Sequence, residues 1–173
     1  MEQSSLYFRC TLTPTQYQAA MAAPAARPRE FDDWQQWLER SIGAGEFSEQ
    51  DLDSGGRGAL GEWLEVWTQD TPGSLLQYDA AQGVWQFALL EFTDNYGEML
   101  QLLAPLRRAA QYADPEADSF VLIYSYLWGD GDDAFITLDQ QRSQFAEAPS
   151  AQQRAEADAV LGGLMHTVQQ MYD

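Results

Sequence analysis

The order of apolar and polar residues divides the N-terminal part of the chain into a strand and a helix. Residues 6–12 form a run rich in aromatic and β-compatible side chains, which is typical of a strand. Thr13 and Pro14 follow it, and because threonine caps helices and proline fits the first helical position, they predict a helix over residues 15–23. The Pro/Ala-rich stretch 22–28 then ends that helix.

Two further segments repeat their apolar residues with helical spacing. The apolar face of the first consists of Phe31, Trp34, Trp37, Leu38 and Ile42. That of the second consists of Leu60, Trp63, Leu64 and Trp67. Gly43 and Gly45 end the first helix, and Pro72-Gly73 follows the second, so residues 24–72 are predicted to be a helical insertion.

The C-terminal half alternates between hairpins and helices. Residues 75–78 and 84–92 flank a short polar turn and predict a β-hairpin, and residues 120–128 with 134–138 predict a second one. Between the hairpins, Thr93-Asp94 can cap a helix whose buried stripe is Tyr96, Met99, Leu100, Leu103 and Leu106. Pro105 lies within that stripe and should kink or divide the helix. A last helix is expected from about residue 150 to residue 171.

These elements predict one α+β domain over residues 1–173, with helices packed on an antiparallel sheet of about five strands. Without the insertion, the order strand–helix–strand–strand–helix–strand is that of the split βαβ, ferredoxin-like fold. Another α+β sheet with helices on one face stays open as an alternative.

The net charge of the chain indicates which class of partner it can bind. The chain contains 27 acidic residues, nine arginines and no lysine, which gives a formal net charge of -18. Because 45% of the residues are hydrophobic, this charge indicates an acidic surface rather than disorder. Residues 30–70 and 114–139 hold most of the excess, so we expect a negative patch that attracts a basic partner and disfavours nucleic-acid phosphates and anionic lipids.

The sequence contains no pattern that predicts an enzyme or a cofactor. Cys10 is the only cysteine and lies in an apolar run, and His166 is the only histidine. A phosphate-binding loop of the Walker type is excluded because the chain lacks lysine, and no G-x-S-x-G motif is present. We therefore expect a binding protein rather than a catalyst.

Two acidic loops are candidates for a divalent cation. Asp51, Asp53, Gly56 and Glu62 fit the frame of an EF-hand calcium loop, but Gly55 lacks the oxygen ligand of the fifth position. An ordinary loop before a helix is the favoured interpretation. The second loop carries Asp130, Asp132 and Asp133 and also suits an exposed hairpin turn.

Residues 75–139 give the chain a family resemblance. The aromatic-rich strand 84–92, the helix start Asp94-Asn95-Tyr96 and the apolar strand 120–128 resemble the cytosolic immunity proteins of bacterial toxin–immunity systems, including those paired with contact-delivered or type VI secretion effectors. This resemblance implies inhibition by occlusion of a toxin's active site. A toxin that acts on nucleic acid would offer a basic groove, in which carboxylates replace the phosphates.

We expect the partner to contact the acidic clusters, namely Asp32, Asp33, Glu39, Glu49, Asp51, Asp53, Asp130, Asp132 and Asp133. An acidic nucleic-acid mimic that inhibits a DNA-binding protein is the alternative, and a calcium sensor or metal-dependent enzyme using the 51–62 loop is a third hypothesis. The N-terminal segment lacks a basic, apolar leader pattern. No apolar run is long enough to span a bilayer as a helix, so the expected compartment is the cytoplasm.

Overall fold

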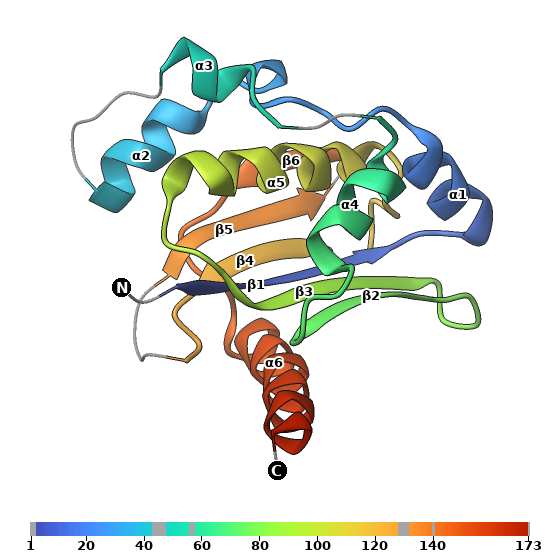
Figure 1. Ribbon diagram of the computed structural model, residues 1–173. Coiled ribbons are helices and arrows are strands. Elements are labelled where there is room, and N and C mark those ends of the chain that lie inside the picture. The colour runs from blue at the N-terminus through green and yellow to red at the C-terminus, as the bar shows by residue number, and fades with distance from the viewer. Residues whose placement is uncertain (1–2, 43–47, 56–57, 128–131, 140, 173) are drawn as a thin grey trace.

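Six antiparallel strands form one sheet in the computed structural model, which describes residues 3–42, 48–55, 58–127, 132–139 and 141–172 (Figure 1). The strands are β1 (Ser4–Thr11), β2 (Ser74–Asp79), β3 (Val84–Thr93), β4 (Phe120–Tyr124), β5 (Asp132–Asp139) and β6 (Arg142–Phe145). The α-helices are α1 (Pro14–Ala22), α2 (Trp34–Ile42), α3 (Glu49–Leu52), α4 (Leu60–Thr68), α5 (Tyr96–Arg108) and α6 (Ala151–Met171). Two short 3₁₀ helices, η1 and η2, span Pro28–Glu30 and Ala109–Gln111.

The strand order β2-β3-β1-β4-β5-β6 confirms the α+β class. Strand β1 pairs antiparallel with both β3 and β4, and β3 also pairs antiparallel with β2. Strands β1 and β2 are therefore parallel to each other and separated by β3, whereas β3 and β4 are parallel and separated by β1. Two interlocked split βαβ units result, in the order expected of a ferredoxin-like core. Strands β5 and β6 extend this core at the β4 edge, and β6 was not predicted.

The helices are divided unequally between the two faces of the sheet. Figure 1 shows α1 to α5 on one face, with α2, α3 and α4 in the insertion between α1 and β2, and α6 on the other face. Capping boxes begin both the first and the last helix: Thr13 pairs reciprocally with Gln16, and Ser150 with Gln153. No helix in the described part of the chain is long and apolar enough to cross a membrane.

Strand β4 is shorter than the apolar run that predicts it. Its pairing with β5 shifts register between Ile123 and Tyr124, and the Tyr126 N–H then donates to the Tyr124 carbonyl at 3.1 Å. This local turn takes the chain out of the sheet, because the Tyr126 N–H no longer points toward a neighbouring strand. Residues 128–131, which include the predicted end of the strand, lie outside the described residues.

Helix α5 continues through Pro105 and is not divided there. A proline inside a helix removes one N–H and leaves the carbonyl four residues earlier, here that of Gln101, without its helical partner. The indole N–H of Trp63 on α4 donates to the Gln101 carbonyl at 3.2 Å. The hydrogen bond lost to Pro105 is thereby replaced by a tertiary one, which lets the helix pass through the proline.

Each face of the sheet has its own apolar core. The larger core lies under α1 to α5 and includes fully buried side chains such as Trp85, Phe87 and Leu103. The smaller core lies under α6, where Ala157 and Leu161 of the helix meet sheet residues such as Phe120. That the chain is a single domain with a helical insertion at 24–72 stays a prediction.

Candidate partner-binding site

Two of the predicted contact residues, Glu49 and Asp53, surround Arg29 of η1. The Arg29 guanidinium donates to both oxygens of Asp53, at 2.6 and 2.8 Å, and also pairs with Glu49 of α3. The Arg29 guanidinium lowers the pKa of the Asp53 carboxyl through this hydrogen bonding. Both acids are exposed, but part of their charge is already balanced within the chain.

Asp33 is engaged inside the fold by Arg107 of α5. Two parallel hydrogen bonds join the Arg107 guanidinium to the two oxygens of Asp33, at 2.6 and 2.8 Å. The Ser143 hydroxyl oxygen accepts a third hydrogen bond from Arg107 at 2.8 Å. Only 2% of the Arg107 side chain is exposed. Its guanidinium carbon lies 4.3, 4.8 and 5.0 Å from the ring centroids of Phe31, Trp34 and Phe145.

Asp132 begins strand β5 and pairs with Arg154 of α6. Its side chain is about one-quarter exposed, and the ion pair links this end of the sheet to the last helix. Asp130, predicted to belong to the same acidic turn, lies outside the described residues.

The Asp133 carboxylate is half-buried among polar partners. It accepts hydrogen bonds from the hydroxyls of Ser4 and Tyr96, and the Asp133 backbone carbonyl accepts the indole N–H of Trp37 at 2.6 Å. Burial raises the pKa of this carboxyl, and the hydrogen bond from Ser4 opposes the rise. Asp133 thus joins β1, β5, α2 and α5 at one point.

The remaining predicted contacts, Asp32, Glu39 and Asp51, differ in their surroundings. Asp32 and Glu39 are exposed, and neither forms an ion pair with another described residue. Asp51 is half-buried and accepts the Ser48 N–H at 3.2 Å, in the capping box of α3. The eight predicted acids that the structure describes therefore do not share one environment.

The EF-hand frame does not bring its ligands together. Asp51 caps α3, Asp53 binds Arg29, and Glu62 accepts the Ala59 N–H at 3.3 Å. Within the described part of the chain, no three acidic, histidine or cysteine side chains are placed to hold a metal ion. Gly56 lies outside the described residues.

The single cysteine and the single histidine occupy unrelated places. Cys10 is fully buried in β1, and burial raises the pKa of its thiol to about 12. His166 is exposed on α6, with its Nε2 atom 3.1 Å from the side-chain amide nitrogen of Gln170. The apolar run that contains Cys10 is therefore buried together with its thiol.

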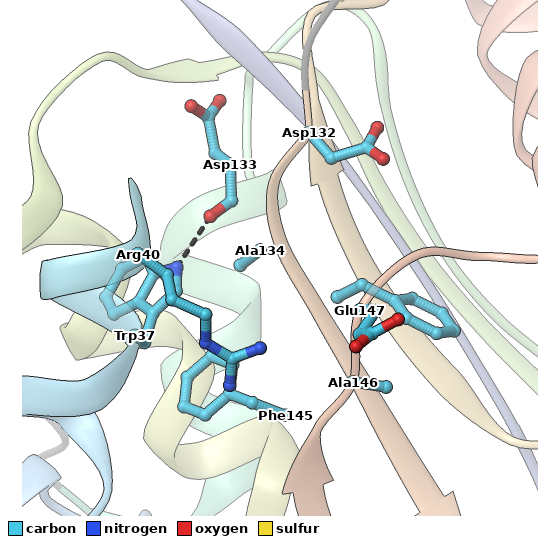
Figure 2. A pocket seen from close by; sticks show the side chains of 9 residues that line it. Trp37, Arg40, Asp132, Asp133, Ala134, Phe145, Ala146 and Glu147 are labelled. Atoms are coloured by element: carbon cyan, nitrogen blue, oxygen red, sulfur yellow. Dashed lines mark hydrogen bonds between the residues drawn. The ribbon is translucent and has the colours of Figure 1, made fainter. Parts of the chain in front are cut away.

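A cavity of about 380 Å³ opens between α2, the start of β5 and the chain that follows β6 (Figure 2). Its lining combines aromatic, acidic and basic side chains: Trp37, Arg40, Asp132, Asp133, Ala134, Phe135, Phe145, Ala146 and Glu147. Figure 2 shows the Arg40 side chain reaching across the same opening toward the Phe145 ring. The rings of Trp37 and Phe135 are only 4% and 5% exposed, so their faces are largely covered and the charged side chains dominate the opening.

Sequence reasoning identified Asp132 and Asp133 but missed Phe145 and Glu147, which complete this cavity. Both depend on strand β6, whose four residues carry too short an alternation of apolar and polar side chains to be recognised. Trp37 was predicted to lie on the buried face of its helix, and only 4% of it is exposed. It also lines the cavity.

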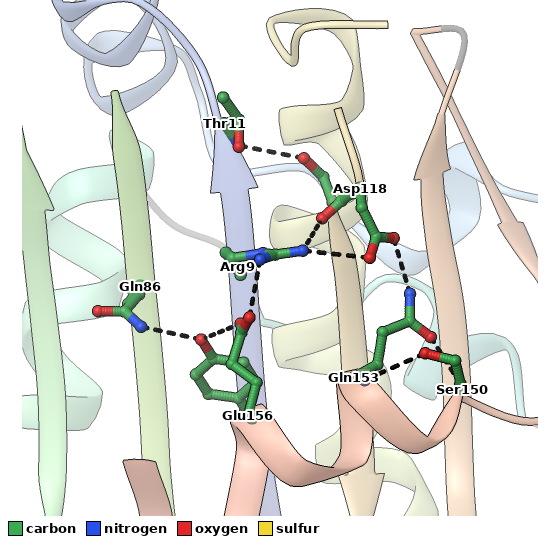
Figure 3. Close-up of polar contacts among 9 residues, drawn as sticks. Arg9, Thr11, Gln86, Asp118, Ser150, Gln153 and Glu156 are labelled. Carbon is green, nitrogen blue, oxygen red and sulfur yellow. Dashed lines mark hydrogen bonds and ion pairs between the residues drawn. The ribbon is translucent and has the colours of Figure 1, made fainter. Parts of the chain in front are cut away.

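A second polar cluster lies beneath α6 (Figure 3). Glu156 accepts hydrogen bonds from the Tyr7 hydroxyl at 2.6 Å and from Arg9 at 2.7 Å, while the Gln86 amide donates to the Tyr7 oxygen at 2.9 Å. Burial, followed by the hydrogen bond to Glu156, raises the pKa of Tyr7. These contacts join α6 to the sheet, and Asp118 extends the cluster through its ion pair with Arg9 at 3.3 Å.

Comparison with known proteins adds no relative, because no protein-family model, curated protein or solved structure matches this chain.

Proposed function

We propose that this chain is a cytoplasmic immunity protein that binds a cognate antibacterial toxin and covers its active site. The proposal assigns no catalytic residue and no cofactor. The toxin is expected to present a basic surface, such as a groove that binds nucleic acid or a nucleotide, and the carboxylates of the immunity protein take the place of the phosphates.

The observation that carries this proposal is an excess of carboxylates that the chain does not neutralise. Nine arginines oppose 27 acids, so one-to-one pairing leaves 18 acids over. Among the described residues, ion pairs with acids of the same chain already engage Arg9, Arg29, Arg107, Arg108 and Arg154. The surplus negative charge must therefore be balanced by solvent ions or by a partner, and this surplus favours a basic protein as the partner.

The end of the molecule around α2 is the best candidate for the contact. Glu39 of α2 and Glu147 after β6 are exposed, neither pairs with a described arginine, and Asp32 just before α2 has the same properties. The cavity beside α2 adds one half-buried aromatic side chain, Phe145, and aromatic residues are favoured at the centres of interfaces. A partner at this end therefore meets three exposed carboxylates beside a partly exposed ring.

The test is binding and protection after removal of these three charges. We expect the triple variant Asp32→Asn, Glu39→Gln, Glu147→Gln to bind the product of the adjacent toxin gene about tenfold more weakly, because exposed charge pairs are individually worth a few tenths to about one kcal/mol. The measurements are co-purification from cells, association rates at two salt concentrations, and survival of toxin-expressing cells.

The matched control removes three exposed acids elsewhere: Glu65→Gln, Glu91→Gln and Glu116→Gln, on α4, β3 and the loop before β4. Both triples change the net charge equally, so equal losses would indicate a diffuse charge effect and not a contact at α2. Full protection by the first triple would contradict the proposed surface. Binding that duplex DNA displaces, with no toxin gene nearby, would support the nucleic-acid mimic instead.

A further inference from the structure

We propose that the outer edge of strand β2 pairs with β2 of a second copy of this chain. The two sheets join into one antiparallel sheet across a two-fold axis. This inference goes beyond the proposed function and does not depend on it, because it concerns the association of the chain with itself. Three features of the molecule support it: open backbone groups, a lack of charge, and exposed apolar side chains beside the edge.

Strand β2 presents an open row of backbone groups. It lies at one end of the sheet and pairs with β3 alone (Figure 1). The Leu90 N–H of β3 donates to the Gly73 carbonyl at 2.8 Å. Because residues bonded to the neighbouring strand alternate with residues that point away from it, Ser74, Leu76 and Tyr78 direct their N–H and C=O groups outward. These groups can bind another strand without any change in the fold.

The two edges of the sheet differ in their protection against such pairing. Proteins protect edge strands by keeping them short, by placing charges on them, or by interrupting them with bulges. Strand β6, at the far edge, has four residues and begins with the exposed Arg142. Strand β2 has six residues, pairs with β3 without a bulge, and carries only one charge, Asp79 at its end. The β2 edge is therefore the less protected of the two.

The lack of charge at this edge favours a second copy as the occupant. Residues 71–90 contain one charged side chain and residues 159–172 contain none, although 21% of the chain is charged. Two chains that each carry a net charge of -18 repel each other, so they associate most readily where neither presents charge. A basic partner is instead attracted to acids, which lie elsewhere on the surface.

Exposed apolar side chains flank the edge on both faces of the sheet. A Val168 methyl carbon of α6 lies 3.3 Å from the point where a side chain on Gly73 would begin, just before β2. One turn further along, Met171 and Tyr172 are 64% and 80% exposed. On the other face, Val66 of α4, the helix that packs beside β2, is 66% exposed. Among the described residues, these three are the large apolar side chains left exposed, and a second copy at the edge gives them a surface to pack against.

A symmetric register pairs the outward groups completely. With the two-fold axis at Leu76, this residue faces Leu76 of the copy, and Ser74 faces Tyr78 of the copy. Asp79 then faces Gly73 of the copy and not another acid, so no like charges stand opposite each other. The edge of β2 is thus complementary to itself, as a two-fold interface requires.

The test uses the full chain alone. Sedimentation equilibrium measures the dimer, for which we expect a dissociation constant on the order of 10 µM. Amide hydrogen exchange then locates the interface. Raising the protein concentration well above this constant should slow exchange of the Ser74, Leu76 and Tyr78 amides about tenfold. The amides of Leu75 and Gln77 point toward β3 and should keep their rates, so a dimer at this edge gives protection at every second residue.

Salt separates this association from binding of a toxin. Raising the ionic strength screens the repulsion between two acidic chains, so the dimer should become tighter. The proposed toxin contact depends on attraction between opposite charges and should become weaker under the same change. Failure of one proposal therefore does not imply failure of the other.

Two variants and a control complete the test. Gln77→Glu places an acid near the axis on each copy, and we expect it to weaken the dimer about tenfold. The double variant Met171→Ser, Tyr172→Ser should weaken it by a similar factor. Gln144→Glu is the matched control, because Gln144 is an exposed glutamine of the other edge strand, and it should have little effect. Unchanged exchange of the Leu75 amide verifies that β2 stays folded in each variant.

Several outcomes would overturn the inference. A chain that stays monomeric at about 1 mM has no such edge contact. A dimer without protection at alternate residues of β2, or one that Gln77→Glu and Gln144→Glu weaken equally, uses another surface. A dimer that salt weakens is held by charge. Protection of β2 that appears only after the toxin is added would assign the edge to the toxin and not to a second copy.

Discussion

The two faces of the sheet are covered by different means. Helices α1 to α5 lie over one face and close a large core whose residues, such as Leu103 and Phe87, are fully buried. The other face carries one helix of 21 residues, of which only Ala157 and Leu161 are buried. Val160, Leu164, Met165 and Val168 pack partly buried against the same core. Hydrogen bonds and ion pairs from Glu156, Asp158 and Arg154 add a polar attachment at this face.

This difference separates two kinds of stability. Apolar packing hardly depends on pH or salt, whereas contacts between ionised groups at a partly exposed surface weaken with salt and change with protonation. We therefore expect α6 to open locally while the sheet and its helical face remain folded.

The largest effect should come from removing a buried side chain in the core under α1 to α5. Leu103→Ala is expected to lower the free energy of unfolding by about 2 to 5 kcal/mol, because the surrounding core cannot collapse into the space. Leu161→Ala on α6 should lower the global free energy of unfolding by less than Leu103→Ala does. Its main effect should be faster amide hydrogen exchange within α6. Urea denaturation and amide exchange measure both quantities, and equal global losses would remove the distinction between the faces.

The next effect concerns the buried ion pair. Asp33→Ala leaves the Arg107 guanidinium buried without its carboxylate. We expect this change to cost about 3 kcal/mol of stability. Asp32 is the exposed neighbour in the sequence, and Asp32→Ala should leave the free energy of unfolding nearly unchanged. If both variants unfold at the same urea concentration, the Asp33–Arg107 pair does not stabilise the fold.

A smaller effect is expected at the polar attachment of α6. Glu156→Gln weakens contacts to both Tyr7 and Arg9, so α6 should become more accessible to protease. The expected cost is about 1 kcal/mol. A double-mutant cycle with Tyr7→Phe isolates the Tyr7–Glu156 contact. Strictly additive effects would mean that this contact contributes nothing to the attachment.

The last prediction concerns the attachment of α6, which should be unaffected at neutral pH and should weaken in alkaline solution. Burial and the carboxylates of Glu156 and Asp158 raise the pKa values of Tyr7 and Tyr124 above the ordinary tyrosine value of 10.0. A raised pKa in the folded state gives stability that is complete below the unfolded value and is lost as the pH rises through the folded one. Amide exchange of α6 should therefore accelerate above about pH 10 before that of α5, and simultaneous acceleration would contradict the assignment.

Local signals in the sequence were sufficient for much of the fold. Thr13-Pro14 correctly marked the start of α1, and the apolar segments on either side of residues 79–83 correctly predicted the β2–β3 hairpin. Strand β6 was missed because its residues pack through tertiary contacts, such as Phe145 on Trp37, and not through a repeated pattern. Helix α3 is a single turn and has no periodicity to detect.

The candidate site was less accessible to sequence reasoning, because it depends on which acids are paired. Asp32 and Asp33 are adjacent and chemically identical in the sequence, yet Asp33 binds a buried arginine and Asp32 is exposed. That difference follows from the position of Arg107 on a helix distant in sequence. Clusters of acidic residues in the sequence could therefore predict an acidic surface, but not which of these residues a partner can reach.

Trp63 and Pro105 also constrain how this chain can change. A substitution of Pro105 by alanine restores an N–H that competes with the Trp63 indole for the Gln101 carbonyl, whereas losing Trp63 beside an intact proline leaves that carbonyl without a donor. Trp63 is thus more tolerant of replacement once the proline has gone. In any set of related sequences, we expect the tryptophan to accompany the proline, as a covarying pair drawn from two different helices.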